Sequence, residues 1–133
     1  MNGGDGADRL TGGLGADLQT GGDKADAFVF LALTDSTKKA SGRDSILDFD
    51  RAEGDKIDLS AIDARTGDGS ATSAFKFIGK KGFDDVDGKK GELRSVEKHG
   101  DSLIQGDVNG DDKADFSILV DGVSKLKHTD FDL

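Results

Sequence analysis

The chain has 133 residues, no Cys, no Trp, no Tyr and a formal net charge of -9. This charge disfavours nucleic acid and anionic membrane surfaces as partners, and the lack of cysteine excludes disulfides. With 20 Gly, no Pro and 34% hydrophobic residues, the composition indicates one loop-rich β domain whose thin core needs another source of stability. The acidity is almost all aspartate, with 24 Asp against 3 Glu, which favours short carboxylates placed in turns.

Residues 3–11, 12–20 and 21–29 are three copies of a nine-residue repeat, reading GGDGADRLT, GGLGADLQT and GGDKADAFV. Glycine tolerates φ > 0, so each copy can turn tightly and aim its carbonyl oxygens inward. The aspartate at the sixth position adds a hard anionic oxygen, and Ca²⁺ takes six to eight oxygen ligands. Each copy therefore predicts six residues of turn and three of strand, so that alternate copies stack on one side of a parallel roll.

Two copies depart from the pattern. The third has Lys24 where a glycine is expected, which predicts strained backbone dihedrals at that residue. The second reads Leu18-Gln19, with its apolar position shifted by one, which predicts a polar side chain pointing inward.

The pattern changes after the repeats. A long apolar strand is expected at 26–33, and shorter runs follow at 45–49, 56–59, 74–78, 92–96, 102–105 and 116–120. Turns rich in Gly, Asp and Lys separate these runs, which is typical of antiparallel hairpins in a sandwich. No run reaches the roughly 18 apolar residues of a membrane-spanning helix. We therefore predict a roll over 1–33 and a sandwich over 34–133, packed as one module.

A second acidic segment has oxygen-bearing side chains at Asp107, Asn109, Asp111 and Asp115. This spacing is similar to that of a calcium loop, although the glutamate at its twelfth position is missing and Asp112 stands where glycine is usual. A tight hairpin turn is the alternative, and we favour it.

The repeats match G-G-x-G-x-D-x-U-x, the calcium-binding repeat of RTX proteins. With its later segments the chain resembles the C-terminal module of the serralysin-type RTX family, found in secreted bacterial metalloproteases, lipases, alginate epimerases and adhesins. Those segments are DSILDF at 44–49, GDKIDLS at 54–60, AFKFIG at 74–79, GELR at 91–94, GDVNGD at 106–111 and DFDL at 130–133. The resemblance implies an all-β fold, a parallel β-roll running into an antiparallel β-sandwich, that folds on calcium binding outside the cell.

The family geometry also implies two calcium sites. The first would take the carbonyls of Gly3, Asp5, Gly22 and Lys24 and the carboxylates of Asp8 and Asp26. The second would use Gly12, Leu14, Asp17, Asp35 and Asp44, because the nine-residue spacing of aspartates continues to Asp35 and Asp44. Turn capping is the alternative for these last two.

The predicted function is a calcium-binding folding and secretion module of a larger extracellular protein, disordered without calcium. Its implied partners are calcium, a type I (ABC) secretion machinery and an N-terminal passenger domain. The start of the chain carries no signal peptide and lies inside the repeats, as though a longer chain had been cut. The tail 126–133 resembles a type I secretion signal, although Asp132 stands where an apolar residue is more common; completing the last strand is its other role.

Other functions are less favoured. An adhesin or polysaccharide-binding module is the alternative, but Trp and Tyr are missing. The chain lacks H-E-x-x-H, G-x-S-x-G and a cysteine nucleophile, so we expect no enzyme here and assign any catalysis to a missing N-terminal domain. His99 and His128 are expected at the surface, and the acidic run 84–87 is expected to be solvated.

Overall fold

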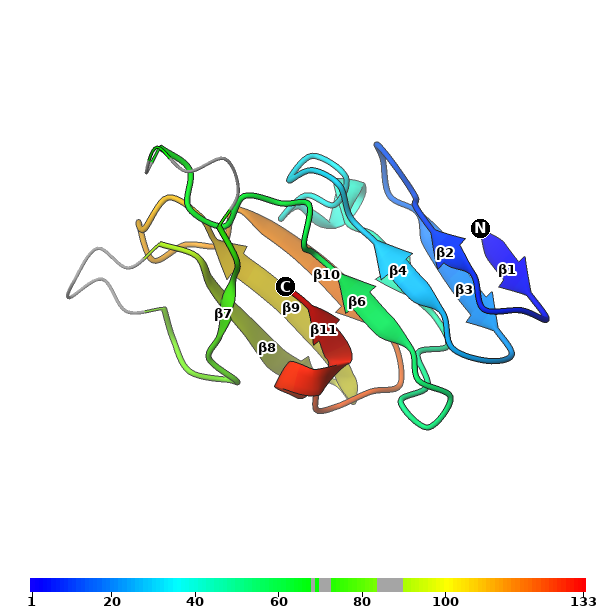
Figure 1. The fold of residues 1–133 in the computed structure, drawn as a ribbon. Coiled ribbons are helices and arrows are strands. Elements are labelled where there is room, and N and C mark those ends of the chain that lie inside the picture. Colours follow the sequence, from blue (N-terminus) through cyan, green and yellow to red (C-terminus); the bar gives the residue numbers. More distant parts are fainter. Residues whose placement is uncertain (68, 70–72, 84–89) are drawn as a thin grey trace.

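The structure is a computed structural model that describes residues 1–67, 69, 73–83 and 90–133 (Figure 1). In this part of the chain, two β-sheets form two layers. One sheet has the order β1-β3-β5-β10-β9-β8-β7 and the other β11-β6-β4-β2. The only helical elements among these residues are two 3-10 turns, η1 (Ala40–Gly42) and η2 (His128–Asp130), which confirms the all-β prediction. None of the described helices could span a bilayer. The acidic run 84–87 lies outside the described residues.

The first six strands alternate between the two sheets. They are β1 (Asn2–Gly4), β2 (Arg9–Leu10), β3 (Leu18–Gly22), β4 (Ala27–Val29), β5 (Ser45–Ile46) and β6 (Lys56–Asp58). β1, β3 and β5 pair in parallel in the larger sheet, as do β2, β4 and β6 in the smaller one. The chain thus winds as a parallel roll, as the repeats predict. β5 and β6 extend the parallel pairing beyond residue 33, so the predicted roll (1–33) and the predicted sandwich (34–133) share both sheets. The domain boundary at residue 33 stays a prediction.

The strand expected over 26–33 is shorter than predicted and ends at Val29. Beyond it, Asp35 Oδ2 accepts hydrogen bonds from the backbone N–H groups of Leu31 and Ala32, at 2.8 and 3.2 Å. The local aspartate therefore turns the chain, and Leu31 remains 56% exposed in spite of its apolar side chain.

The remaining strands form the sandwich. They are β7 (Lys76–Phe77), β8 (Glu92–Lys98), β9 (Asp101–Asp107), β10 (Phe116–Val120) and β11 (Phe131–Asp132). β8, β9 and β10 are antiparallel, as predicted. β10 joins β5 in parallel, β11 joins β6 in parallel, and β7 pairs in parallel with β8. The runs at 45–49, 56–59 and 74–78 are therefore not hairpin strands, because each pairs in parallel with strands that are distant in sequence.

The core lies between the two sheets and is filled by alternate residues of the strands. Leu10, Gln19 and Phe28 stand at the same position of the three repeats and are 2%, 0% and 0% exposed. Leu18, by contrast, is 60% exposed. The predicted inward polar side chain is thus confirmed, and Gln19 is a buried amide that pairs across the sheet with Ile46 of the apolar core.

The C-terminal tail is bound to the roll. Arg51, in the turn before β6, donates from Nε and Nη2 to the two carboxylate oxygens of Asp130, at 2.7 and 2.6 Å. Burial opposes ionisation of Asp130, but the Arg51 bonds and the Lys127 N–H outweigh it and lower the pKa of this carboxyl. An ion pair between the partly exposed Arg51 and the buried Asp130 therefore holds the segment that continues into β11, and Phe131 is 5% exposed in the core.

Candidate metal centre

The turns of the roll stack in two rows. The first turn row connects the larger sheet to the smaller one and contains residues 5–8, 23–26 and 47–55. The second turn row runs in the opposite direction and contains residues 11–17 and 30–44. Repeats one and three therefore share a row, and repeat two shares the other row with Asp35 and Asp44, which is the stacking that the spacing predicts.

A ladder of aspartates joins successive turns of the first turn row. The backbone N–H of Asp8 donates to Asp26 Oδ1 at 2.8 Å, and the N–H of Asp26 donates to Asp55 Oδ1 at 2.9 Å. Burial, with the nearby charges of Asp26 and Asp48, raises the pKa of Asp55. Asp55 was not among the predicted residues. Equivalent aspartates of this row, such as Asp8 and Asp26, are 18 residues apart, whereas Asp55 lies 29 residues after Asp26. Its place directly before a strand, as with Asp8 and Asp26, is the feature that could have identified it.

One oxygen of each sixth-position aspartate in this row has no hydrogen-bond partner among the described residues. Asp8 Oδ2 and Asp26 Oδ2 are buried and accept no hydrogen bond in the described structure. Such an atom is costly to bury unless a partner is supplied. Both oxygens pack directly against glycines: a Cβ atom on Gly3 would lie 2.7 Å from Asp8 Oδ2 and from the Gly21 carbonyl oxygen, and one on Gly21 would lie 2.2 Å from Asp26 Oδ2. A bound cation would satisfy both carboxylate oxygens, and Ca²⁺ prefers carboxylate and carbonyl oxygens as ligands, so these residues fit the ion that the sequence implies.

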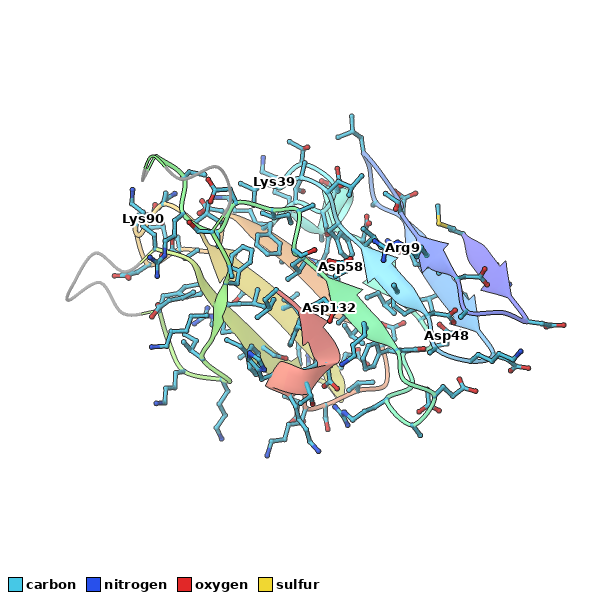
Figure 2. All side chains as sticks on the ribbon, viewed as in Figure 1. Arg9, Lys39, Asp48, Asp58, Lys90 and Asp132 are labelled. Atoms are coloured by element: carbon cyan, nitrogen blue, oxygen red, sulfur yellow. The ribbon has the colours of Figure 1, made fainter. Side chains whose placement is uncertain are left out.

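The backbone of this row agrees with the prediction for Lys24, which adopts φ 81° in a region that favours glycine. Gly21 adds a carbonyl one residue before the predicted Gly22. Another missed residue, Asp48, accepts the N–H groups of both Gly21 and Gly22, at 2.8 and 2.9 Å (labelled in Figure 2). The carbonyls of Gly3, Asp5, Gly22 and Lys24 remain predicted ligands.

The second turn row repeats the arrangement. Asp17 N–H donates to Asp44 Oδ1 at 2.9 Å, and Asp17 Oδ2 is buried without a partner. A Cβ atom on Gly12 would lie 2.8 Å from Asp44 Oδ2 and 2.9 Å from Asp17 Oδ2, so the two oxygens face the same small space. Burial raises the pKa of Asp44 from 3.8 to about 6, and the charges of Asp17 and Asp35 act in the same direction. A cation between the carboxylates would act in the opposite direction.

The other two predicted residues of this site are placed differently. Asp35 caps the turn through Oδ2, which agrees with the alternative reading, and its charge also acts on Asp44. The Leu14 side chain is 79% exposed, so only its carbonyl could face an ion. Among the described residues, no three His, Cys, Asp or Glu side chains gather to hold a metal by themselves. Any ion bound in these rows would therefore need backbone carbonyls as well.

The acidic segment after β9 is a hairpin loop between β9 and β10. Asp107 Oδ1 accepts the N–H groups of Asn109 and Gly110, and Oδ2 accepts that of Asp112. Asp115 accepts the N–H of Val108 and the side-chain amide of Asn109. Asn109 Oδ1 and Asp111 Oδ1 each accept a backbone N–H two residues further on. Because these oxygens already cap the turn, the hairpin interpretation is the better one, and metal binding here stays a weaker prediction.

The smaller sheet carries an ion pair across its outer surface. Arg9 in β2 donates to Asp58 in β6 at 3.1 Å, over the intervening β4 (Figure 2). Burial opposes ionisation of Asp58, but hydrogen bonds from Ser60 and Arg9 lower its pKa. His99 and His128 are both exposed, as predicted.

The chain belongs to the peptidase M10 serralysin C-terminal family, whose sequence model matches residues 2–132. It is thus an RTX-type calcium-binding module of the kind found in secreted proteins, and the matched region is the non-catalytic C-terminal part of these peptidases. No curated protein sequence matches the chain. A similar solved structure is the solution structure of the AlgE6R2 subunit from the Azotobacter vinelandii mannuronan C5-epimerase, with 22% identity over 98% of this chain and 79% of that one and a TM-score of 0.40. Similarity at that level says nothing of function, so the family match carries the assignment.

Proposed function

We propose that this chain is a calcium-triggered folding module, in which each turn row binds calcium and the roll is ordered only when calcium is bound. The observation that carries the proposal is the set of buried, unpartnered oxygens Asp8 Oδ2, Asp17 Oδ2 and Asp26 Oδ2. All three belong to repeat aspartates, and each packs against a glycine at which an added Cβ atom would clash with it.

The ligands divide between the two rows. In the first turn row the carboxylates of Asp8 and Asp26 would bind calcium, with carbonyls from Gly3, Gly21, Asp5, Gly22 and Lys24 to complete the coordination. In the second turn row the carboxylates would come from Asp17 and Asp44, supported by Gly12, Leu14 and Asp35. Calcium would supply the positive charge that these buried carboxylates lack.

Without calcium, the stacked carboxylates repel one another and the thin roll cannot compensate for the cost of ordering its glycines. An affinity on the order of 10⁻⁴ to 10⁻³ M is typical of extracellular modules. At about 10 mM calcium each site would then stabilise the fold by roughly 1.4 to 2.7 kcal/mol.

The test compares circular dichroism and thermal unfolding in chelator, in 10 mM calcium and in 10 mM magnesium. We expect a gain of β signal and a higher Tm in calcium, and little of either in magnesium, which requires six short ligands in octahedral geometry. Identical spectra and Tm values in chelator and calcium would refute the proposal.

The module is also proposed to serve secretion of a larger extracellular protein through a type I machinery. Low cytosolic calcium would leave the chain unfolded and able to thread a channel, and folding outside would prevent its return. The tail 129–133 would be read in the unfolded chain, since Asp130 and Phe131 are only 1% and 5% exposed once the domain is folded.

Deleting residues 129–133 from a passenger fusion, in cells with a type I transporter, should abolish secretion. This deletion also removes β11. The control is therefore Arg51→Gln, which removes the ion pair to Asp130 but keeps the tail sequence, and which should still be secreted. Undiminished secretion of a stable passenger after the deletion would show that the signal lies elsewhere.

A further inference from the structure

Gln19 is the one repeat residue that brings an amide into the core of the roll. It stands where the first and third repeats have Leu10 and Phe28, and it is 0% exposed. An apolar side chain would fill this place without any polar group to satisfy. Packing alone therefore does not explain why this position has an amide side chain.

The amide reaches the second turn row. Gln19 Nε2 donates to Asp44 Oδ2 at 3.0 Å, while Asp44 Oδ1 accepts the Asp17 N–H at 2.9 Å. Each carboxylate oxygen has two acceptor sites, so both oxygens of Asp44 keep one free. Asp44 Oδ2 is also the oxygen that shares the space beside Gly12 with Asp17 Oδ2. The Gln19 bond thus fixes the direction of the oxygen that faces the candidate ion.

The first turn row has no such donor. Asp26 Oδ1 accepts the Asp8 N–H, but Asp26 Oδ2 accepts nothing, and neither Leu10 nor Phe28 could donate to it. Gln19 itself is not fully satisfied, because its Oε1 is buried without a partner in the described structure. A buried acceptor left unpaired opposes folding, so the amide is a poor choice for the core alone.

We propose that Gln19 is a positioning residue for the second calcium site, which it makes different from the first by orienting Asp44. The inference rests on the proposed function, since it requires calcium in the second turn row. Partners that hold a metal ligand in place typically contribute 10- to 100-fold to metal affinity. The effect should originate in the row that contains Asp17 and Asp44 and should not follow from a matched core change beneath the first row.

The test is a calcium titration of the whole chain followed by ¹H–¹⁵N NMR, with two backbone amides as reporters. The Asp17 N–H contacts Asp44 and reports the second turn row, and the Asp8 N–H contacts Asp26 and reports the first. In Gln19→Met, which fills the space but has no N–H donor, the midpoint at Asp17 should rise about 10- to 100-fold. Ordering of the roll couples the two rows, so the midpoint at Asp8 should rise by no more than that at Asp17. Leu10→Met, a comparable core change beneath the first row, should move neither midpoint.

The outcomes separate the two claims. If Gln19→Met shifts neither midpoint, or if Leu10→Met shifts the Asp17 midpoint as much as Gln19→Met does, Gln19 has only a packing role and the inference is wrong. Gln19→Leu, which installs the residue of the first repeat, gives a second variant should the methionine variant not fold. If the wild-type chain shows no calcium-dependent change at either reporter, the proposed function fails, and the inference fails with it.

Discussion

Replacing Gly21 by alanine should remove the first calcium site by steric exclusion alone. The added Cβ atom would lie 2.2 Å from Asp26 Oδ2, and ordinary contacts begin near 3.4 Å, so the carboxylate must move by about 1.2 Å. The hydrogen bond from Asp8 N–H to Asp26 Oδ1, now 2.8 Å, cannot survive such a shift. Gly21 has no positive φ, so the alanine adds no backbone strain of its own.

The expected cost has two parts. Leaving the Asp8 N–H without its acceptor costs about 1–3 kcal/mol. Losing one ion bound at about 100 times its Kd costs about 2.7 kcal/mol more. Alanine also stabilises the fold by roughly 0.4–1 kcal/mol, because it reduces the conformational entropy of the unfolded chain. The net loss is about 3–5 kcal/mol in calcium, which corresponds to a Tm lower by about 10 °C or more.

The assay is thermal unfolding in 10 mM calcium and in chelator, with Gly6→Ala as the matched control. Gly6 lies in the first turn row and, like Gly21, lacks a positive φ, but its added Cβ would meet nothing closer than 3.9 Å. Gly6→Ala should therefore leave the Tm unchanged or slightly higher. In chelator, where the roll is expected to be disordered, the two variants should behave alike. Equal Tm values in calcium would refute the steric argument and the site with it.

Three further predictions follow from named contacts. Arg51→Gln should cost about 1–3 kcal/mol at neutral pH, discounted because Arg51 is partly exposed. The pKa of Asp130 is lowered in the folded protein, so the ion pair contributes fully to stability above the ordinary pKa of aspartate and is lost as the pH falls through the folded-state pKa. The stabilities of wild type and variant should therefore converge in acid. A stability difference that does not change with pH would contradict the ion pair. Asp107→Ala removes the acceptor of three backbone N–H groups and should cost about 2 kcal/mol. Calorimetry should find that the Asp107→Ala variant binds as many calcium ions as the wild type. Loss of one ion would show that this loop is a metal site. Lys24→Gly should stabilise the calcium-bound fold by about 1 kcal/mol, because glycine adopts φ 81° without strain, and a lower Tm would show that the lysine makes a contact of its own.

Much of the roll could be predicted from the sequence because its determinants are local. Glycines and aspartates at fixed offsets specify each turn, and the following three residues specify a strand with one inward side chain. The inward Gln19 and the positive φ of Lys24 could both be read from single departures from the repeat. Asp8, Asp17, Asp26 and Asp44 could likewise be assigned to the two turn rows, since equal spacing places equivalent residues in register.

Only the tertiary structure decided which distant segments complete those rows. Asp48 and Asp55 lie in a longer coil, where the nine-residue count no longer applies, and their carboxylates reach the third repeat only because β5 and β6 pair with β3 and β4. The same holds for the parallel docking of β11 on β6. An apolar run shows that a segment is a strand, but it does not show which strand lies beside it. Closing a longer loop costs little extra entropy, so sequence distance does not decide which strands become neighbours. That choice depends on the apolar surface that the pairing buries, and this surface is formed only in the folded chain.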